Sequence, residues 1–127
     1  MFRNDRVNIS ELLGKTITSI QGMKKDNDEI YFICSDGTKY KMYHDQECCE
    51  EVYIEDVCGN VEDLLNVPIT LAEDISNESN KESLDRGDDS YTWTWYKLAT
   101  VKGYVTIRWY GTSNGYYSEE VDFVKIN

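Results

Sequence analysis

The sequence is poor in proline, histidine and long apolar runs. It contains one proline and one histidine in 127 residues, and no window approaches the ~20 apolar residues of a membrane-spanning helix. The amino-terminal residues also lack the apolar run that a secretory signal needs. These absences argue against a helical membrane protein and against secretion, so we expect a cytoplasmic protein.

Basic residues are missing from one long stretch of the chain. Lys and Arg do not occur between Met42 and Asn80, and the whole chain has a net charge of −11. The carboxylates of that stretch are Asp45, Glu47, Glu50, Glu51, Glu55, Asp56, Glu62, Asp63, Glu73, Asp74 and Glu78. An acidic surface repels phosphate backbones, so we expect no direct nucleic-acid binding and favour a basic protein or a cation as partner. The simpler alternative is that the charge only keeps a small domain soluble.

The four cysteines have no spacing of the C-x-x-C type. We expect Cys34, Cys48, Cys49 and Cys58 to be thiols, because the cytoplasm is reducing and the adjacent pair Cys48–Cys49 is an unusual framework disulfide. The simplest interpretation makes Cys34, Cys48 and Cys58 small buried apolar groups.

What the chain does contain favours β-sheet. Aromatic residues make up 13% of it, with ten tyrosines and three tryptophans, and aromatic side chains prefer strands. Alternating apolar residues predict strands on either side of Ser35-Asp36-Gly37. A three-residue loop there pairs Cys34 with Thr38, Phe32 with Tyr40 and Ile30 with Met42. We predict one α+β domain over residues 1–127, mostly antiparallel β, with about eight strands and two short helical turns.

The helical turns are expected at 10–14, capped by Ser10, and at 61–66, capped by Asn60. Composition predicts a flexible acidic loop over about 76–90.

The last third of the chain is predicted to form a three-strand meander. A two-residue turn at Lys102-Gly103 would pair Leu98 with Ile107 and Tyr96 with Trp109. A three-residue loop at Ser113-Asn114-Gly115 would then pair Ile107 with Val121, Val105 with Phe123 and Arg108 with Glu120.

His44 lies between two predicted strands, four residues before Cys48. Imidazole and thiolate suit zinc, but a structural site needs four ligands, and the candidates for the others are Cys58, Cys34, Glu50 or Asp56. Alternatively, His44 is a hydrogen-bonded structural residue paired with Asp28 or Glu50. A third reading, with Cys48 or Cys49 as a nucleophile activated by His44, is disfavoured because the neighbouring carboxylates raise a thiol's pKa.

The predicted meander places Trp93, Trp95 and Tyr110 on the face opposite Trp109. If that face is uncovered, it is an apolar patch of the kind that marks a partner surface. If the amino-terminal hairpin packs on it, Trp93 and Trp95 are ordinary core residues.

Several motifs between residues 29 and 124 are specific enough to serve as a fingerprint. They are Tyr43-His44-Asp45-Gln46-Glu47-Cys48-Cys49-Glu50, Val52-Tyr53-Ile54-Glu55-Asp56-Val57-Cys58-Gly59, Tyr91-Thr92-Trp93-Thr94-Trp95-Tyr96, Arg108-Trp109-Tyr110-Gly111 and Ser113-Asn114-Gly115-Tyr116-Tyr117-Ser118. In these residues the chain resembles a domain family of unknown function, found in small proteins of bacteriophages and prophage-bearing bacteria. The resemblance implies a stand-alone, phage-encoded domain in the size class of phage inhibitors of host machinery, and it implies no activity or catalytic residue.

These observations predict a small, acidic, non-enzymatic protein-binding module that acts on a basic host protein, without a cofactor or a membrane partner. The predicted binding residues are Glu47, Glu50, Glu51, Glu55, Trp93, Trp95 and Tyr110. The alternatives are a zinc-binding domain with His44, Cys48, Cys58 and Glu50 as ligands, and, more distantly, a Cys/His-dependent enzyme.

Overall fold

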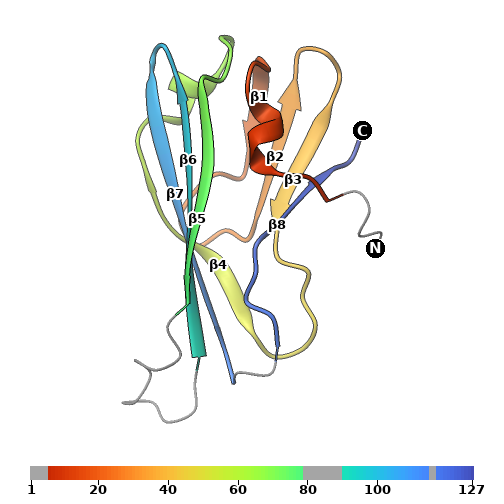
Figure 1. Ribbon diagram of the computed structural model, residues 1–127, viewed down its shortest axis with the longest axis vertical. Helices are drawn as coiled ribbons and strands as arrows, with labels where there is room; N and C mark the ends of the chain where they lie inside the picture. The colour runs from red at the N-terminus through yellow and green to blue at the C-terminus, as the bar shows by residue number, and fades with distance from the viewer. Residues whose placement is uncertain (1–5, 79–89, 115–116) are drawn as a thin grey trace.

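Two four-stranded antiparallel sheets, packed face to face, make up the fold (Figure 1). The structure is a computed structural model that describes residues 6–78, 90–114 and 117–127. Eight strands and two short 3-10 turns lie in these ranges. The predicted α+β, mostly antiparallel class is therefore confirmed.

The first sheet has the strand order β1-β2-β3-β8. Its strands are β1 (Ile17–Gln21), β2 (Glu29–Cys34), β3 (Lys39–Tyr43) and β8 (Asp122–Lys125). The predicted register of the β2–β3 hairpin is confirmed, because Ile30 pairs with Met42 and Phe32 with Tyr40. Gly37 has a φ of 92°, in the left-handed region that this three-residue loop requires.

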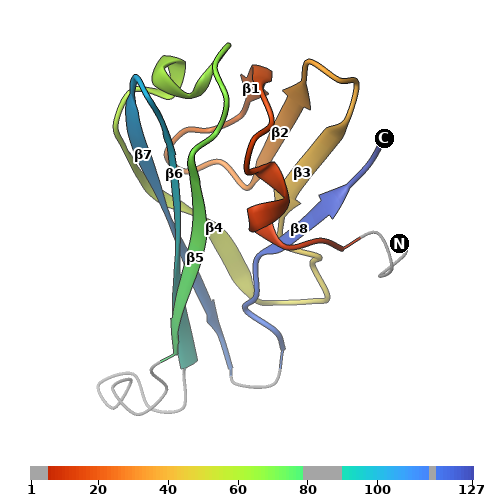
Figure 2. The same cartoon turned by 45° about the horizontal axis from the view of Figure 1, so that its top comes forward.

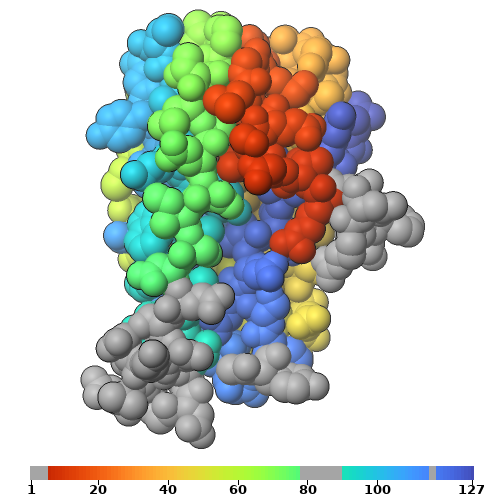
Figure 3. Space-filling model, viewed as in Figure 1, coloured from red at the N-terminus to blue at the C-terminus, as the bar shows by residue number. Residues whose placement is uncertain are grey.

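The second sheet has the strand order β4-β7-β6-β5. Its strands are β4 (Glu51–Cys58), β5 (Leu71–Glu78), β6 (Ser90–Thr100) and β7 (Gly103–Ser113). β5 is an edge strand whose residues 73–77 are exposed. In the space-filling view, the green part of the chain, which includes β5, lies beside the red amino-terminal segment (Figure 3).

The core lies between the two sheets. From the second sheet, Val105, Ile107 and Trp109 face inward and are fully buried. They meet Phe32, Tyr40 and Met42 of the first sheet, which are also fully buried. Strict alternation along β6 and β7 sends every second side chain to the opposite, outer face.

The predicted β6–β7 register is wrong by two residues. The turn is Val101-Lys102, so Leu98 pairs with Val105 and Tyr96 with Ile107. Because side chains alternate with a period of two, a two-residue shift leaves each one on its predicted face. The prediction that Val105, Ile107 and Trp109 share a face is therefore correct.

The predicted pairing of the last strand with β7 is also wrong. β4 occupies that edge of β7, and β8 crosses to the first sheet, where Phe123 pairs with Met42. The ring of Phe123 stacks on Tyr40 at 5.1 Å and meets Phe32 edge-on at 5.9 Å. This aromatic packing gives β8 a partner that local turn chemistry does not indicate.

Two short turns complete the described chain: η2 (Ile9–Leu12) and η3 (Val61–Leu64). Asn60 caps η3 as predicted, but η2 is capped by Asn8 and not by Ser10. No helix in the described ranges is long and apolar enough to cross a membrane. Within the loop predicted at 76–90, residues 76–78 and 90 belong to strands, and residues 79–89 lie outside the described residues.

We expect the substitution Gly59→Ala to destabilise the fold strongly. Gly59 follows β4 with a φ of 113°, and a Cβ there would meet the carbonyl oxygen of Tyr104. Backbone strain and overlap together should lower the free energy of unfolding by more than ~2 kcal/mol. Gly14→Ala is the matched control: its φ is 82°, but nothing lies within 4 Å of an added Cβ, so only the strain of ~1 kcal/mol remains. Urea unfolding of both variants measures the difference, and equal losses would contradict the expectation.

Candidate functional site

His44 and Glu50 form a buried pair that closes the connection between β3 and β4. The side chain of His44 is 3% exposed and that of Glu50 is fully buried, with 2.6 Å between Nε2 and Oε2. The other ring nitrogen, Nδ1, lies 2.6 Å from the carbonyl oxygen of Glu120. A carbonyl only accepts, so Nδ1 carries a hydrogen. When the imidazole holds both protons, it donates to both partners and forms an ion pair with Glu50.

The carboxylate of Glu50 also organises the backbone of its own loop. It accepts hydrogen bonds from the N–H groups of Glu47 at 2.8 Å and Cys48 at 3.0 Å. Burial works against the charged form, but the hydrogen bonds from His44 and from backbone N–H groups outweigh it and lower the pKa of Glu50 to about 2. The pairing of His44 with Glu50, one of the two structural alternatives, is present, and Asp28 is not its partner.

The cysteines differ from the prediction in two respects. Cys48 and Cys49 are joined by a disulfide and are not thiols. Cys48 and Cys58 are exposed, whereas the simplest interpretation made both of them small buried groups. Cys58 lies beyond the point where the inner and outer faces of β4 exchange. The cause is a β-bulge at Glu55, where pairing passes from Ile54–Trp109 directly to Asp56–Arg108 and reverses the faces that follow. Cys34 is a buried thiol, as expected.

This geometry does not assemble the ligands suggested for zinc. Both nitrogens of His44 and both oxygens of Glu50 already have hydrogen-bond partners, Cys48 is in a disulfide, and Cys58 lies at the far end of β4. Across the part of the chain that the structure describes, no group of three or more His, Cys, Asp or Glu side chains is arranged to hold a metal ion. The Cys/His nucleophile likewise lacks a free thiol at Cys48 and Cys49 in this state.

The outer face of the second sheet carries packed aromatic rings. Strand register sets Asn77, Trp93, Tyr110 and Tyr53 in one row across all four strands. The next row contains Ile75, Trp95, Arg108 and Asp56. We call Tyr53, Tyr91, Trp93, Trp95 and Tyr110 the aromatic face.

The rings of the aromatic face contact one another across strands. The ring centroids of Trp93 and Tyr110 are 4.6 Å apart, and those of Trp93 and Trp95 are 6.3 Å apart with nearly parallel planes. Tyr53 and Tyr91 lie 6.1 and 6.2 Å from Tyr110. All five residues remain partly exposed, while the residues that alternate with them on β6 and β7 are buried.

The first sheet lies on the other side of these strands, as the two ribbon views show (Figures 1 and 2). The amino-terminal hairpin therefore packs on the Trp109 face and not on Trp93 and Trp95. Of the two alternatives for these tryptophans, the structure supports the open surface in its described part.

Charged residues border the aromatic face. Arg108 lies over the ring of Trp93 at 5.4 Å and donates to Glu55 from Nε at 2.7 Å. Glu51 is exposed at the start of β4, and Glu73 is exposed on β5 opposite Lys97. Glu47 is exposed in the loop before β4. Glu50, the remaining predicted binding residue, points inward to His44 and takes no part in this surface.

These features define a small antiparallel β-sandwich with an open aromatic sheet surface. Residues 10–123 match the family described as Domain of unknown function (DUF7448), and the chain belongs to that family. No curated protein and no solved structure matches the chain.

Sequence reasoning missed two members of the aromatic face, Tyr53 and Tyr91, and also Arg108 at its border. Tyr91 could have been found, since it alternates with Trp93 and Trp95 along the same strand. Tyr53 depends on the pairing of β4 with β7, a long-range contact that no local pattern indicates.

We expect Glu50→Gln to remove a pH-dependent part of the stability. The pKa of Glu50 is lowered from 4.5 to about 2, so its ionised form favours the folded state above pH ~4.5, and this contribution is lost as the pH falls through about 2. At neutral pH the free energy of unfolding of the variant should be lower by on the order of 2 kcal/mol, because hydrogen bonds to a buried charge are broken.

The measurement is urea unfolding of wild type and variant between pH 7 and pH 2. The difference in the free energy of unfolding between wild type and variant should narrow over the acid part of that range. Glu51→Gln, at the exposed neighbouring position, is the control and should track wild type. A Glu50→Gln gap that stays constant with pH would contradict the assignment.

Proposed function

We propose that this chain is a non-enzymatic protein-binding module, and that its aromatic face binds a basic partner protein. The observation that carries the proposal is the row of rings across the outer side of the β4-β7-β6-β5 sheet, which no second layer covers in the described part of the chain. Burying these rings in a partner would remove apolar surface from water, the main driving force of association.

The chemistry of this face favours a protein as its ligand. Tyr, Trp and Arg are the residues that most often dominate protein–protein binding energies, and here the ring of Trp93 contacts both Tyr110 and Arg108. Their rings are held by sheet pairing and by one another, so little side-chain freedom is lost on binding.

Charge favours a basic partner. The chain has a net charge of −11, and Glu51 and Glu73 stand exposed on the two edge strands that border the rings. Such a surface attracts Lys and Arg side chains and repels nucleic acid. A guanidinium can also stack on an aromatic ring, as the chain's own Arg108 does on Trp93. The resemblance to phage proteins supports a phage-encoded chain with a host protein as the target.

The proposal predicts that removing two rings weakens the binding of one basic protein. Immobilised wild type would be incubated with host lysate, and the captured protein would be identified, purified and titrated against variants. Trp93→Thr with Tyr110→Thr keeps β-forming residues on the strands but should weaken binding by ~2 kcal/mol or more, about 30-fold in Kd. Binding should also weaken as salt rises, because exposed charges are screened.

Tyr104→Thr is the matched control. Tyr104 lies on β7, is 68% exposed and sits beside the β6–β7 turn, away from the rings of the aromatic face. This variant should bind like wild type. An acidic captured protein, or equal losses in the control and the double variant, would contradict the proposal.

A further inference from the structure

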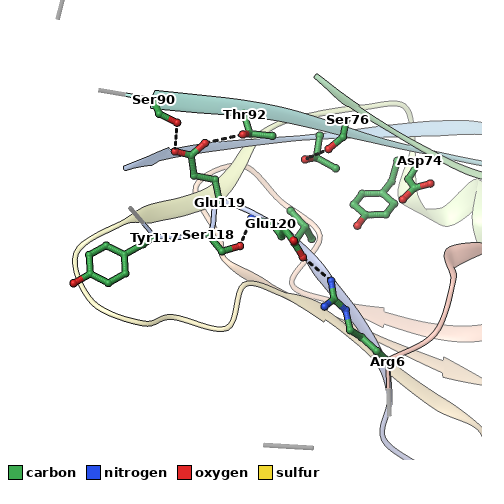
Figure 4. Close-up of a pocket in the computed structure, with 12 residues that line it drawn as sticks. Arg6, Asp74, Ser76, Ser90, Thr92, Tyr117, Ser118, Glu119 and Glu120 are labelled. Carbon is green, nitrogen blue, oxygen red and sulfur yellow. Dashed lines mark hydrogen bonds and ion pairs between the residues drawn. The ribbon is translucent and has the colours of Figure 1, made fainter. Parts of the chain in front are cut away.

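A polar cavity opens on the inner side of β5 and β6, away from the aromatic face (Figure 4). Its volume is about 570 Å³, and hydroxyl groups from Ser76, Ser90, Thr92, Thr94 and Ser118 line it. Apolar ligands need a mostly apolar wall, so this lining excludes them as the natural occupant.

Glu119 is a buried carboxylate at one end of the cavity. It is 8% exposed and accepts hydrogen bonds from Ser90 at 2.7 Å, Thr92 at 2.6 Å and Ser113 at 2.5 Å. Asp74 lies towards the other end, opposite Tyr96 in the β5–β6 pairing. Among the described residues, no Lys or Arg forms an ion pair with either carboxylate.

Among the described residues, Arg6 is the one guanidinium that lines the cavity, and it is already engaged. Arg6 binds Glu120 at 2.7 Å and Asp122 at 2.9 Å. Figure 4 shows its ion pair with Glu120 at the edge of the cavity, at a distance from Glu119 and Asp74. In the part of the lining that the structure describes, three carboxylates, Asp74, Glu119 and Glu120, therefore stand against one cation.

A second and independent observation comes from Tyr96. It is 3% exposed, lines the cavity, and forms no hydrogen bond through its hydroxyl within the described ranges. Burial, followed by the charge of Asp74, raises its pKa, so the phenol stays protonated and polar. The little surface that Tyr96 exposes faces this cavity, so a ligand seated there could donate a hydrogen bond to its hydroxyl.

We propose that this cavity binds a small linear amine, a di- or polyamine with a protonated nitrogen at each end. The two carboxylates without an ion pair are Asp74, opposite Tyr96, and Glu119, which accepts from Thr92. Tyr96 and Thr92 are four residues apart on β6, which corresponds to about 13 Å along a strand. An extended polyamine matches that span, and its N–H groups would donate to Asp74, to the hydroxyl of Tyr96 and to the serine and threonine oxygens between them. Anionic ligands are disfavoured by the same carboxylates. This site does not depend on the proposed protein partner.

Calorimetric titration with spermidine at physiological salt tests the proposal. Wild type should bind one equivalent, and a neutral diol of the same length should not bind. Asp74→Asn should weaken spermidine binding about tenfold or more, because a hydrogen-bonded charge is lost. Asp74 is exposed, so this variant should fold. Tyr96→Phe should weaken binding severalfold without loss of fold.

Because the whole chain is acidic, a charge-matched control is essential. Glu62→Gln removes one exposed charge on η3 and should leave spermidine affinity within about twofold, since screening limits distant charges. The proposal is overturned if spermidine fails to bind at millimolar concentration, if Glu62→Gln and Asp74→Asn lose affinity equally, or if the diol binds as well. It is also overturned if neither Asp74→Asn nor Tyr96→Phe changes affinity.

Discussion

The pairing of β6 with β7 over their full length determines both faces of this protein. Each strand alternates strictly, so one register sends Trp109, Ile107 and Val105 into the core and Trp93 and Tyr110 to the outside. The same register therefore determines both the burial of the core residues and the exposure of the aromatic rings. Any change that slipped this pairing by one residue would exchange the two sets and destroy both the core and the aromatic face.

The His44–Glu50 pair has a complementary role. The chain leaves the first sheet at Tyr43 and enters the second at Glu51, and this crossing must place polar backbone groups near the interior. Glu50 accepts two of those N–H groups, while His44 ties the crossing to the carbonyl of Glu120. The single histidine and its carboxylate thus tie the β3–β4 connection to Glu120, which lies 76 residues beyond His44 in the sequence, and this structural role accounts for their presence.

Local patterns in the sequence predict the strands well and their partners less well. The β2–β3 register can be predicted from the three-residue loop and the buried face of the hairpin, and the structure confirms it. The β6–β7 register is missed because Lys102-Gly103 is a stronger turn signal than Val101-Lys102, yet side-chain faces survive a two-residue shift. The sheet to which β8 belongs could not be predicted, because it depends on aromatic packing with Tyr40 and Phe32. The exposure of Cys58 could not be predicted either, because it depends on the bulge in β4. The aromatic face was predicted in three of its residues, whereas the cavity joins Arg6, Asp74 and Glu119, which no spacing connects.

The exposed edge formed by β5 has a consequence for the behaviour of the molecule in concentrated solution. A long border strand offers backbone groups on which a second copy could extend the sheet. Neighbouring acidic side chains at Glu73 and Asp74 oppose this, because antiparallel alignment of two such strands brings like charges together without a basic residue to separate them. The same acidity that would attract a foreign basic chain thereby discourages polymerisation of the protein with itself.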